Sequence, residues 1–133
     1  MQIDEAALVR PEPWRAFAPR LHIESPALFD NLEFFPRTPD ENREAAERIK
    51  HEGYFQGERM DWGVDIALMA ETVRALSRAG LPPPFAFLYD EFWLPFFKLH
   101  SLYSGLLGEY RLLPDFWVWN VDAKNGESGW KPH

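Results

Sequence analysis

The sequence predicts an α+β fold in which helices pack on an incomplete antiparallel sheet. Apolar residues recur at helical spacing over residues 62–79 and again over residues 90–107. A helix-start signal precedes residues 39–52, and residues 110–122 form an aromatic-rich run of the kind found in strands. We therefore expect the 133 residues to form a single domain or a fragment of one, with helices first and strands last.

The composition excludes several classes of protein. The formal net charge is -7 and no block of Lys and Arg occurs, so binding to nucleic acid or to an anionic membrane surface is disfavoured. Hydrophobic residues make up 46% of the chain, which is enough apolar surface to fold. Because there is no cysteine, any bound metal must be held by His, Asp or Glu.

Nothing in the sequence suggests export or insertion into a membrane. The chain begins with an acidic segment rather than with an apolar signal, and no apolar run reaches the length that spans a bilayer. We therefore expect a cytoplasmic protein that acts on a small molecule.

Residues 1–37 combine prolines with scattered aromatic side chains, which predicts an ordered arm rather than a free tail. A short helix is expected around Ser25 to Leu32, with Ser25 as N-cap and Pro26 at the first helical position.

Residues 38–108 are expected to form a helical support. Thr38 and Glu41 have the spacing of a capping box, and Gly53 suits the end of that helix. A short strand is expected directly after it, at 53–56. The second helix is expected over 62–79, with Asp61 as its cap.

The second and third helices have recognisable apolar faces. After the second helix, residues 85–89 read as a strand or a buried extended connector, and a third helix is expected from Asp90 or Trp93 to about Leu107. The residues that share a face in the second helix are Ile66, Met69, Val73 and Leu76; those in the third are Phe92, Phe96, Leu99, Tyr103 and Leu106.

Residues 109–133 are expected to hold the strands. Phe116 and Val118 would face one side of a strand and Trp117 and Trp119 the other. Because both faces are largely apolar, this strand is predicted to lie inside a sheet, followed by a turn at Asn125-Gly126.

Standard catalytic signatures are absent from the sequence. There is no dinucleotide-binding glycine motif, no phosphate-binding loop, no nucleophile elbow and no His-Glu-x-x-His. Of the four histidines, we interpret His22 and His51 as surface or hydrogen-bonded side chains. We interpret His100 as a side chain at the edge of the core, although it is the second candidate for chemistry after His133. His133 differs because it follows the predicted strand and turn.

Several stretches resemble an iron(II)/2-oxoglutarate-dependent oxygenase, most closely the phytanoyl-CoA dioxygenase-like group. The stretches that carry the resemblance are Gly53–Phe55, Gly80–Pro83, Phe85–Trp93, Leu112–Trp119 and Gly129–His133. The resemblance implies a double-stranded β-helix (jelly-roll) barrel, of which residues 109–133 would be the first strands. It also implies that His133 is the first iron ligand, followed in the family by an acidic residue two positions on and by a distal histidine.

The expected activity follows from this resemblance. A complete protein would use Fe(II) and 2-oxoglutarate to hydroxylate a small organic substrate. The 133 residues contain neither the acidic partner of His133 nor a distal histidine after it. We therefore expect the chain to be the N-terminal portion of such an enzyme and to be inactive in isolation.

Other interpretations stay open at this point. The chain could be a non-enzymatic module that self-associates, or binds a partner, through its aromatic strand and exposed sheet edge. Trp117 and Trp119, with Tyr89, could line a pocket for a planar ligand or cofactor. The neighbouring acids Asp90 and Glu91 could act as a general acid and base, or could cap the third helix.

Overall fold

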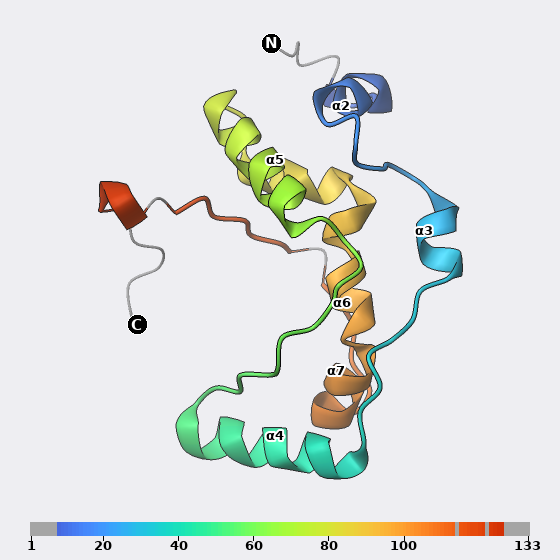
Figure 1. The fold of residues 1–133 in the computed structure, drawn as a ribbon, viewed down its shortest axis with the longest axis vertical. Helices are drawn as coiled ribbons and strands as arrows, with labels where there is room; N and C mark the ends of the chain where they lie inside the picture. The colour runs from blue at the N-terminus through green and yellow to red at the C-terminus, as the bar shows by residue number, and fades with distance from the viewer. Residues whose placement is uncertain (1–7, 114, 122, 127–133) are drawn as a thin grey trace. The chain divides into compact units, whose positions relative to one another are not determined.

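The structure is a computed structural model of the 133 residues, in which residues 8–113, 115–121 and 123–126 are described (Figure 1). These residues fall into two compact units. Of the described residues, the first unit comprises 8–24, 65–92, 115–121 and 123–126, and the second comprises 25–64 and 93–113.

Every regular element in the described ranges is a helix, so the predicted α+β fold with a jelly-roll barrel is wrong. Residues 115–121 are extended, but they have no β-strand assignment. Alternation of side chains along a segment indicates that its two sides lie in different environments. A β-strand also requires a neighbouring strand that pairs with its backbone N–H and C=O groups. Two other expected strands do not form, since residues 53–56 are irregular and residues 85–89 belong largely to a 3₁₀ helix. The return strand expected towards residue 133 lies outside the described residues.

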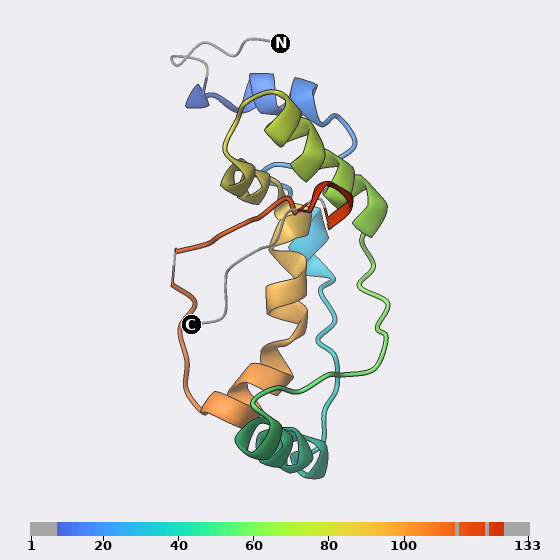
Figure 2. The same cartoon turned by 90° about the vertical axis from the view of Figure 1, so that its left-hand side faces the viewer.

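The described residues of the first unit contain two α-helices and three 3₁₀ helices. They are α2 (Pro11–Phe17), α5 (Ile66–Arg78), η1 (Pro83–Leu88), η2 (Asp90–Phe92) and η3 (Ala123–Asn125), and Figure 2 shows η1 lying beside α5. The sequence predicts Asp61 as the cap of this helix and Ile66 as one of the residues on its apolar face. The cap is Asp65 instead, since its Oδ1 accepts a hydrogen bond from the Leu68 amide at 2.9 Å. Asp61 closes a turn at Gly63, and Ile66 is 52% exposed.

The core of the first unit gathers around two aromatic side chains. Trp14 is 2% exposed and Tyr89 is 0% exposed. The Trp14 indole donates to the Leu8 carbonyl at 2.9 Å, and the Tyr89 hydroxyl donates to the Trp14 carbonyl at 2.8 Å, so both polar groups are satisfied. The buried cluster consists of Trp14, Ala18, Leu21, Leu76, Ala86, Tyr89 and Phe92.

The second unit contains four α-helices: α3 (Pro26–Asp30), α4 (Pro39–Glu52), α6 (Leu94–Lys98) and α7 (His100–Leu107). The predicted capping box of α4 is confirmed: Thr38 Oγ1 accepts from the Glu41 amide at 3.3 Å, and Glu41 Oε2 accepts from the Thr38 amide at 2.6 Å. Gly53 ends α4 at a φ of 81°, which a side chain would disfavour. The predicted short helix after Ser25 also forms, although the Ser25 side chain does not cap it.

The predicted third helix is not continuous. It is divided into η2, α6 and α7, and Leu99 ends α6 and begins α7 with φ -84° and ψ 9°. Pro95 falls in the first turn of α6, where its missing N–H does little harm. The run of prolines before Phe85 favours the 3₁₀ helix η1 over the strand expected there, because each ring presets a helical φ.

Helices α4 and α7 pack closely at one glycine, and both views show them side by side (Figures 1 and 2). A Cβ added at Gly105 would collide with the side chain of Asn42. That side chain donates from Nδ2 to the Ser101 carbonyl at 3.3 Å and so joins the two helices. Among the described helices, none is long and apolar enough to cross a bilayer.

Candidate functional site

Among the described residues of the first unit, the most exposed aromatic side chains lie in the extended run 115–121, which we call the aromatic segment. Phe116 and Val118 are half-buried, and the Phe116 ring lies 4.6 Å from that of Phe87 in η1. Trp117 is 69% exposed and Trp119 49% exposed. The alternation read from the sequence therefore exists, but the expectation of a strand interior to a sheet is wrong, because one side rests on the unit and the other faces solvent.

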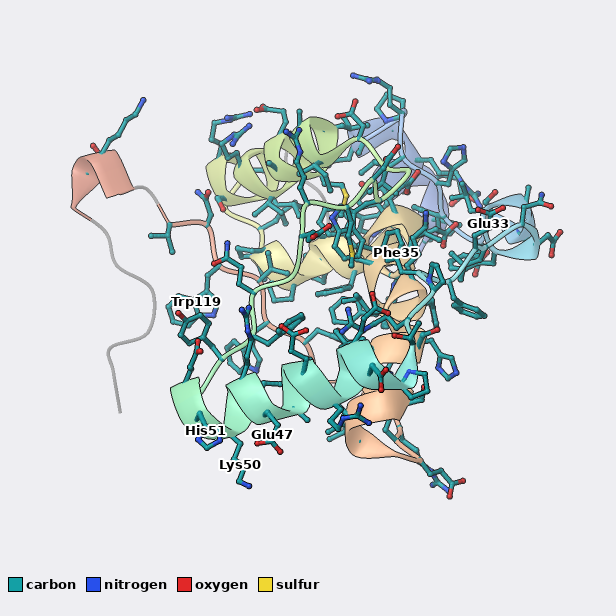
Figure 3. All side chains as sticks on the ribbon, turned by 60° about the horizontal axis from the view of Figure 1, so that its bottom comes forward. Glu33, Phe35, Glu47, Lys50, His51 and Trp119 are labelled. Carbon is teal, nitrogen blue, oxygen red and sulfur yellow. The ribbon has the colours of Figure 1, made fainter. Side chains whose placement is uncertain are left out.

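The exposed side of the aromatic segment is a period-two apolar stripe made by Trp117, Trp119 and Val121, and Figure 3 labels Trp119 on it. Alternate side chains of an extended chain project to the same side, so these three share a face. Large apolar side chains that gather on a surface mark binding sites more often than single ones do. The exposed side of the aromatic segment is therefore a candidate surface for binding another molecule.

Tyr89 does not share a pocket with Trp117 and Trp119, whereas the binding of a ligand or cofactor by the two tryptophans stays a prediction. Tyr89 lies in the core, where burial raises the pKa of its hydroxyl to about 12. Trp117 is on the surface, so the two rings do not line one cavity. Tyr89 acts through its hydrogen bond to the Trp14 carbonyl, which joins η1 to α2.

The neighbouring acids Asp90 and Glu91 have a role that neither sequence interpretation anticipated. Both are buried, with 9% and 7% exposure. Glu91 accepts from the His22 amide at 3.1 Å and lies 2.6 Å from His22 Nδ1. The Asp90 amide donates to the His22 carbonyl at 2.9 Å, and Asp90 Oδ1 accepts from the Glu24 amide at 3.3 Å. The pair thus fixes the segment 22–24 against η2.

A carboxylate bonded to Nδ1 orients an imidazole, as it does in catalytic triads. In the described part of the chain, however, the side-chain contacts recorded for His22 are with Glu91, and none is with a hydroxyl nucleophile. The arrangement can hold two distant segments together, and it lacks the third group that nucleophilic catalysis needs. No local signal in the sequence announces this contact, since 69 positions separate the two residues.

The other two described histidines, His51 and His100, make separate contacts and do not form a common site. His51 is on the exposed side of α4, where its Nε2 lies 3.3 Å from Glu47 Oε2, and Figure 3 shows these side chains projecting from the helix with Lys50. His100 Nδ1 lies 2.9 Å from the Tyr110 hydroxyl. Because His100 is exposed, its placement at a core edge is wrong, whereas the surface interpretation of His51 is confirmed.

The described residues do not fit an iron site. No group of three or more His, Asp or Glu side chains in those ranges could hold a metal ion. Fe(II) sites of the expected type need two imidazoles and a carboxylate converging on one point. His133, the predicted ligand, lies outside the described residues, so that prediction stays a prediction.

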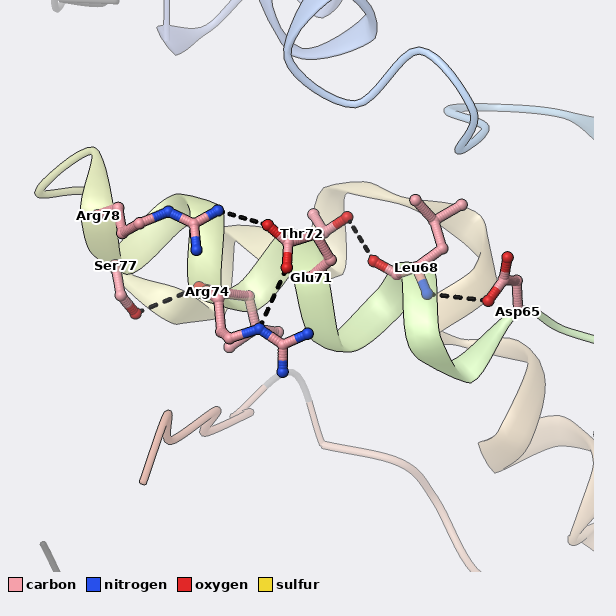
Figure 4. Close-up of polar contacts among 8 residues, drawn as sticks. Asp65, Leu68, Glu71, Thr72, Arg74, Ser77 and Arg78 are labelled. Atoms are coloured by element: carbon pink, nitrogen blue, oxygen red, sulfur yellow. Dashed lines mark hydrogen bonds and ion pairs between the residues drawn. The ribbon is translucent and has the colours of Figure 1, made fainter. Parts of the chain in front are cut away.

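The outer face of α5 carries a surface network that accounts for its charged residues (Figure 4). The Glu71 carboxylate accepts hydrogen bonds from Arg78 and Arg74, which lower its pKa. Thr72, which is buried, and Ser77, which is half-buried, donate their hydroxyls to the carbonyls of Leu68 and Val73 in the same helix, at 2.9 Å and 3.2 Å. The Glu71 carboxylate is thus paired with two arginines of its own helix.

No family model, no curated protein and no solved structure matches the chain. The resemblance to oxygenases therefore stays a prediction.

Proposed function

We propose that this chain is the helical N-terminal portion of an iron(II)/2-oxoglutarate-dependent oxygenase-like protein that hydroxylates a small organic substrate. In this proposal the 133 residues supply support and a binding surface, and they do not supply a complete catalytic centre. The aromatic segment is the surface through which they join the part that carries the iron. The support is of two kinds, the resemblance over Leu112–Trp119 and Gly129–His133 and the exposure of the aromatic segment.

The observation that carries the proposal is the two-sided environment of the aromatic segment. Phe116 is anchored on η1 through Phe87, so the segment is held in place. Trp117 and Trp119 nevertheless leave 69% and 49% of their surface in water. Burying the exposed parts of both rings would contribute on the order of 5 kcal/mol. A partner that covers this stripe therefore gains a large part of its binding free energy from two side chains.

The proposal assigns Fe(II) and 2-oxoglutarate to the complete protein, where together they supply the oxidising chemistry. Because the described residues do not fit an iron site, no reaction step is assigned to them. Their part is to hold the aromatic segment on the core of the first unit, through the Phe87–Phe116 contact and the buried cluster beneath η1.

The test of the proposal is to read the coding sequence beyond codon 133. We expect any one residue followed by Asp or Glu directly after His133, and a further histidine downstream. A stop codon immediately after His133 would contradict the proposal, because a single chain could then not complete the ligand set.

A matching assay uses the 133-residue chain with Fe(II) and 2-oxoglutarate. We expect no stoichiometric release of succinate. Release that disappears in a His133→Ala variant would show that the chain is catalytic alone, which would contradict the supporting role proposed for it.

A second candidate function is self-association through the same stripe, and the exposure of Trp117 favours it. Size-exclusion chromatography with light scattering separates the two. A discrete dimer that is lost in Trp117→Ser but kept in Leu107→Ser would support self-association, since Leu107 is equally exposed at 66% and belongs to the second unit. A monomer at all concentrations would exclude it.

A further inference from the structure

A second surface feature lies in the other unit and is independent of the function proposed above. An open groove with a volume of about 610 Å³ is bordered by helices α4 and α7 and by Arg37. This volume is within the range of small-molecule sites, about 300–1,000 Å³. The wall of the groove has no side chain at Gly105, and a Cβ added there would collide with Asn42.

The groove concentrates positive charge in an acidic chain. The positive charge comes from Arg37 and Arg43, His100 also lines the groove, and none of the described residues that border it carries a carboxylate. The chain as a whole has 21 acidic and 14 basic residues, so such a grouping is not what the composition alone would produce. Arg43 forms an ion pair with Asp40, and both side chains are largely exposed, at 70% and 83%. Pairs of this kind are worth little and can exchange partners.

Arg37 is held in place mainly by neutral acceptors. Its Nε donates to Asn42 Oδ1 at 2.7 Å, and its Nη2 donates to the Glu41 carbonyl at 2.9 Å. The guanidinium carbon lies 5.4 Å from the centre of the Phe55 ring, which adds a cation–π contact. These contacts orient the planar group without neutralising its charge.

The Glu41 carboxylate, on which the charge of Arg37 acts, forms its hydrogen bonds with Thr38. The Glu41 carboxylate accepts hydrogen bonds from the Thr38 amide and hydroxyl, at 2.6 Å and 2.9 Å. The hydrogen bond from the Thr38 amide is the main reason that the pKa of Glu41 is lowered, and the charge of Arg37 is the smallest of its causes. Arg37 therefore keeps most of its capacity to attract an anion.

The groove also offers an acceptor for a hydroxyl group. Ser104 Oγ donates its proton to the His100 carbonyl at 2.8 Å, so its lone pairs remain to accept from a ligand. An anion alone would not use this acceptor, whereas a ligand that also carries a hydroxyl group would.

We propose that the groove between α4 and α7 binds a small hydroxylated anion, with its phosphate or carboxylate group on Arg37, Arg43 and His100 and a hydroxyl group on Ser104. Guanidinium groups bind both kinds of anion through paired, charge-assisted hydrogen bonds.

The test is calorimetric titration of the 133-residue chain at constant ionic strength with glycerol 3-phosphate, glycerate and glycerol as probes. We expect at least one anion to bind and glycerol not to bind, and the tighter anion identifies the group that the site prefers. Absence of heat with both anions, or equal binding of glycerol, would overturn the proposal.

Variants locate the binding to the groove. We expect Arg43→Gln to weaken binding about tenfold, which is the loss of one charge-assisted hydrogen bond. This side chain is exposed, so the variant should fold, and circular dichroism checks that it does. Arg74→Gln is the matched control, because Arg74 is also a surface arginine paired with an acid but belongs to the first unit. An equal loss in both variants would overturn the assignment.

Discussion

The two units of the chain differ in how they are held together. In the described residues, the first unit buries seven apolar side chains, Trp14 and Tyr89 among them, together with Thr72 and the two acids of η2. The second unit buries only Ala45 and Leu94, and its helices meet through the Asn42–Ser101 hydrogen bond and the close approach at Gly105. Stability follows apolar burial, so the first unit is expected to be the more stable one.

This difference separates two ways of building a surface. The first unit has a core firm enough to hold an apolar segment whose other face is in water. The second unit has little core and an open polar groove between two helices. The proposed functions follow the same division, with apolar association on the first unit and anion binding on the second.

The largest expected effect comes from the core of the first unit. Trp14→Ala removes a fully buried ring and the indole hydrogen bond to Leu8, and it should lower the free energy of unfolding by about 3–5 kcal/mol. Trp62→Ala in the second unit is the control, because that ring is half-buried against Phe35. Urea denaturation followed by circular dichroism measures both. Equal losses would contradict the difference between the units.

The next effect tests the buried acids. Glu91→Ala leaves the amide and the ring of His22 without their acceptor, and it should cost about 1–3 kcal/mol. Glu91→Gln keeps an acceptor oxygen and should lose less. Denaturation midpoints of the two variants give the comparison, and a neutral Glu91→Ala would mean that segment 22–24 is not fixed by η2.

The second unit should respond to a change in its helix cap rather than in its core. Thr38→Ala removes the side-chain acceptor of the capping box and should destabilise α4 by about 1 kcal/mol. Amide hydrogen exchange in α4 and α5 measures where the loss falls. Faster exchange confined to α4 is expected, and an equal change in α5 would show that the units unfold as one.

The smallest effect concerns backbone strain beside the buried acids. Glu24 has a φ of 57°, a conformation that costs a side-chain-bearing residue about 1–2 kcal/mol. Glu24→Gly relieves this cost but adds freedom to the unfolded chain, so the net gain in stability should be below about 1 kcal/mol. A rise in the thermal midpoint is expected, whereas a fall would mean that the Glu24 side chain stabilises this turn.

The buried hydroxyl of Tyr89 makes the stability of the first unit depend on pH. Its pKa is raised by burial from 10.0 to about 12, so the folded state holds the phenolic proton more tightly than the unfolded state. The stability contributed by this group is complete below pH 10 and is lost as the pH rises towards 12. Denaturation curves of the wild type and of Tyr89→Phe should therefore converge over this interval. A constant difference would contradict the burial of the hydroxyl.

Local features of the fold could be predicted from the sequence. The Thr38–Glu41 capping box and the termination of α4 at Gly53 depend on residues within a few positions of each other. Leu76 was placed on the buried face of α5 because helical periodicity fixes it there. These elements formed as expected because their causes are local.

Features that depend on distant partners could not be predicted. The aromatic segment has the alternation of a strand, but alternation does not supply a neighbouring strand. The contact of His22 with Glu91 joins residues far apart in the sequence, and neither residue type nor spacing announces it. The groove between α4 and α7 depends on the packing of Gly105 against Asn42, which only the three-dimensional structure contains.

The most direct test of the account is amide hydrogen exchange of the 133-residue chain by NMR. If the aromatic segment is a surface held out for a partner, the amides of Trp117, Val118 and Val121 should exchange with little protection while those of Leu76 and Tyr89 exchange slowly. Protection of Trp117 and Val118 as strong as that of Leu76 would mean that the segment is already paired within the chain, and the proposed binding surface would not exist.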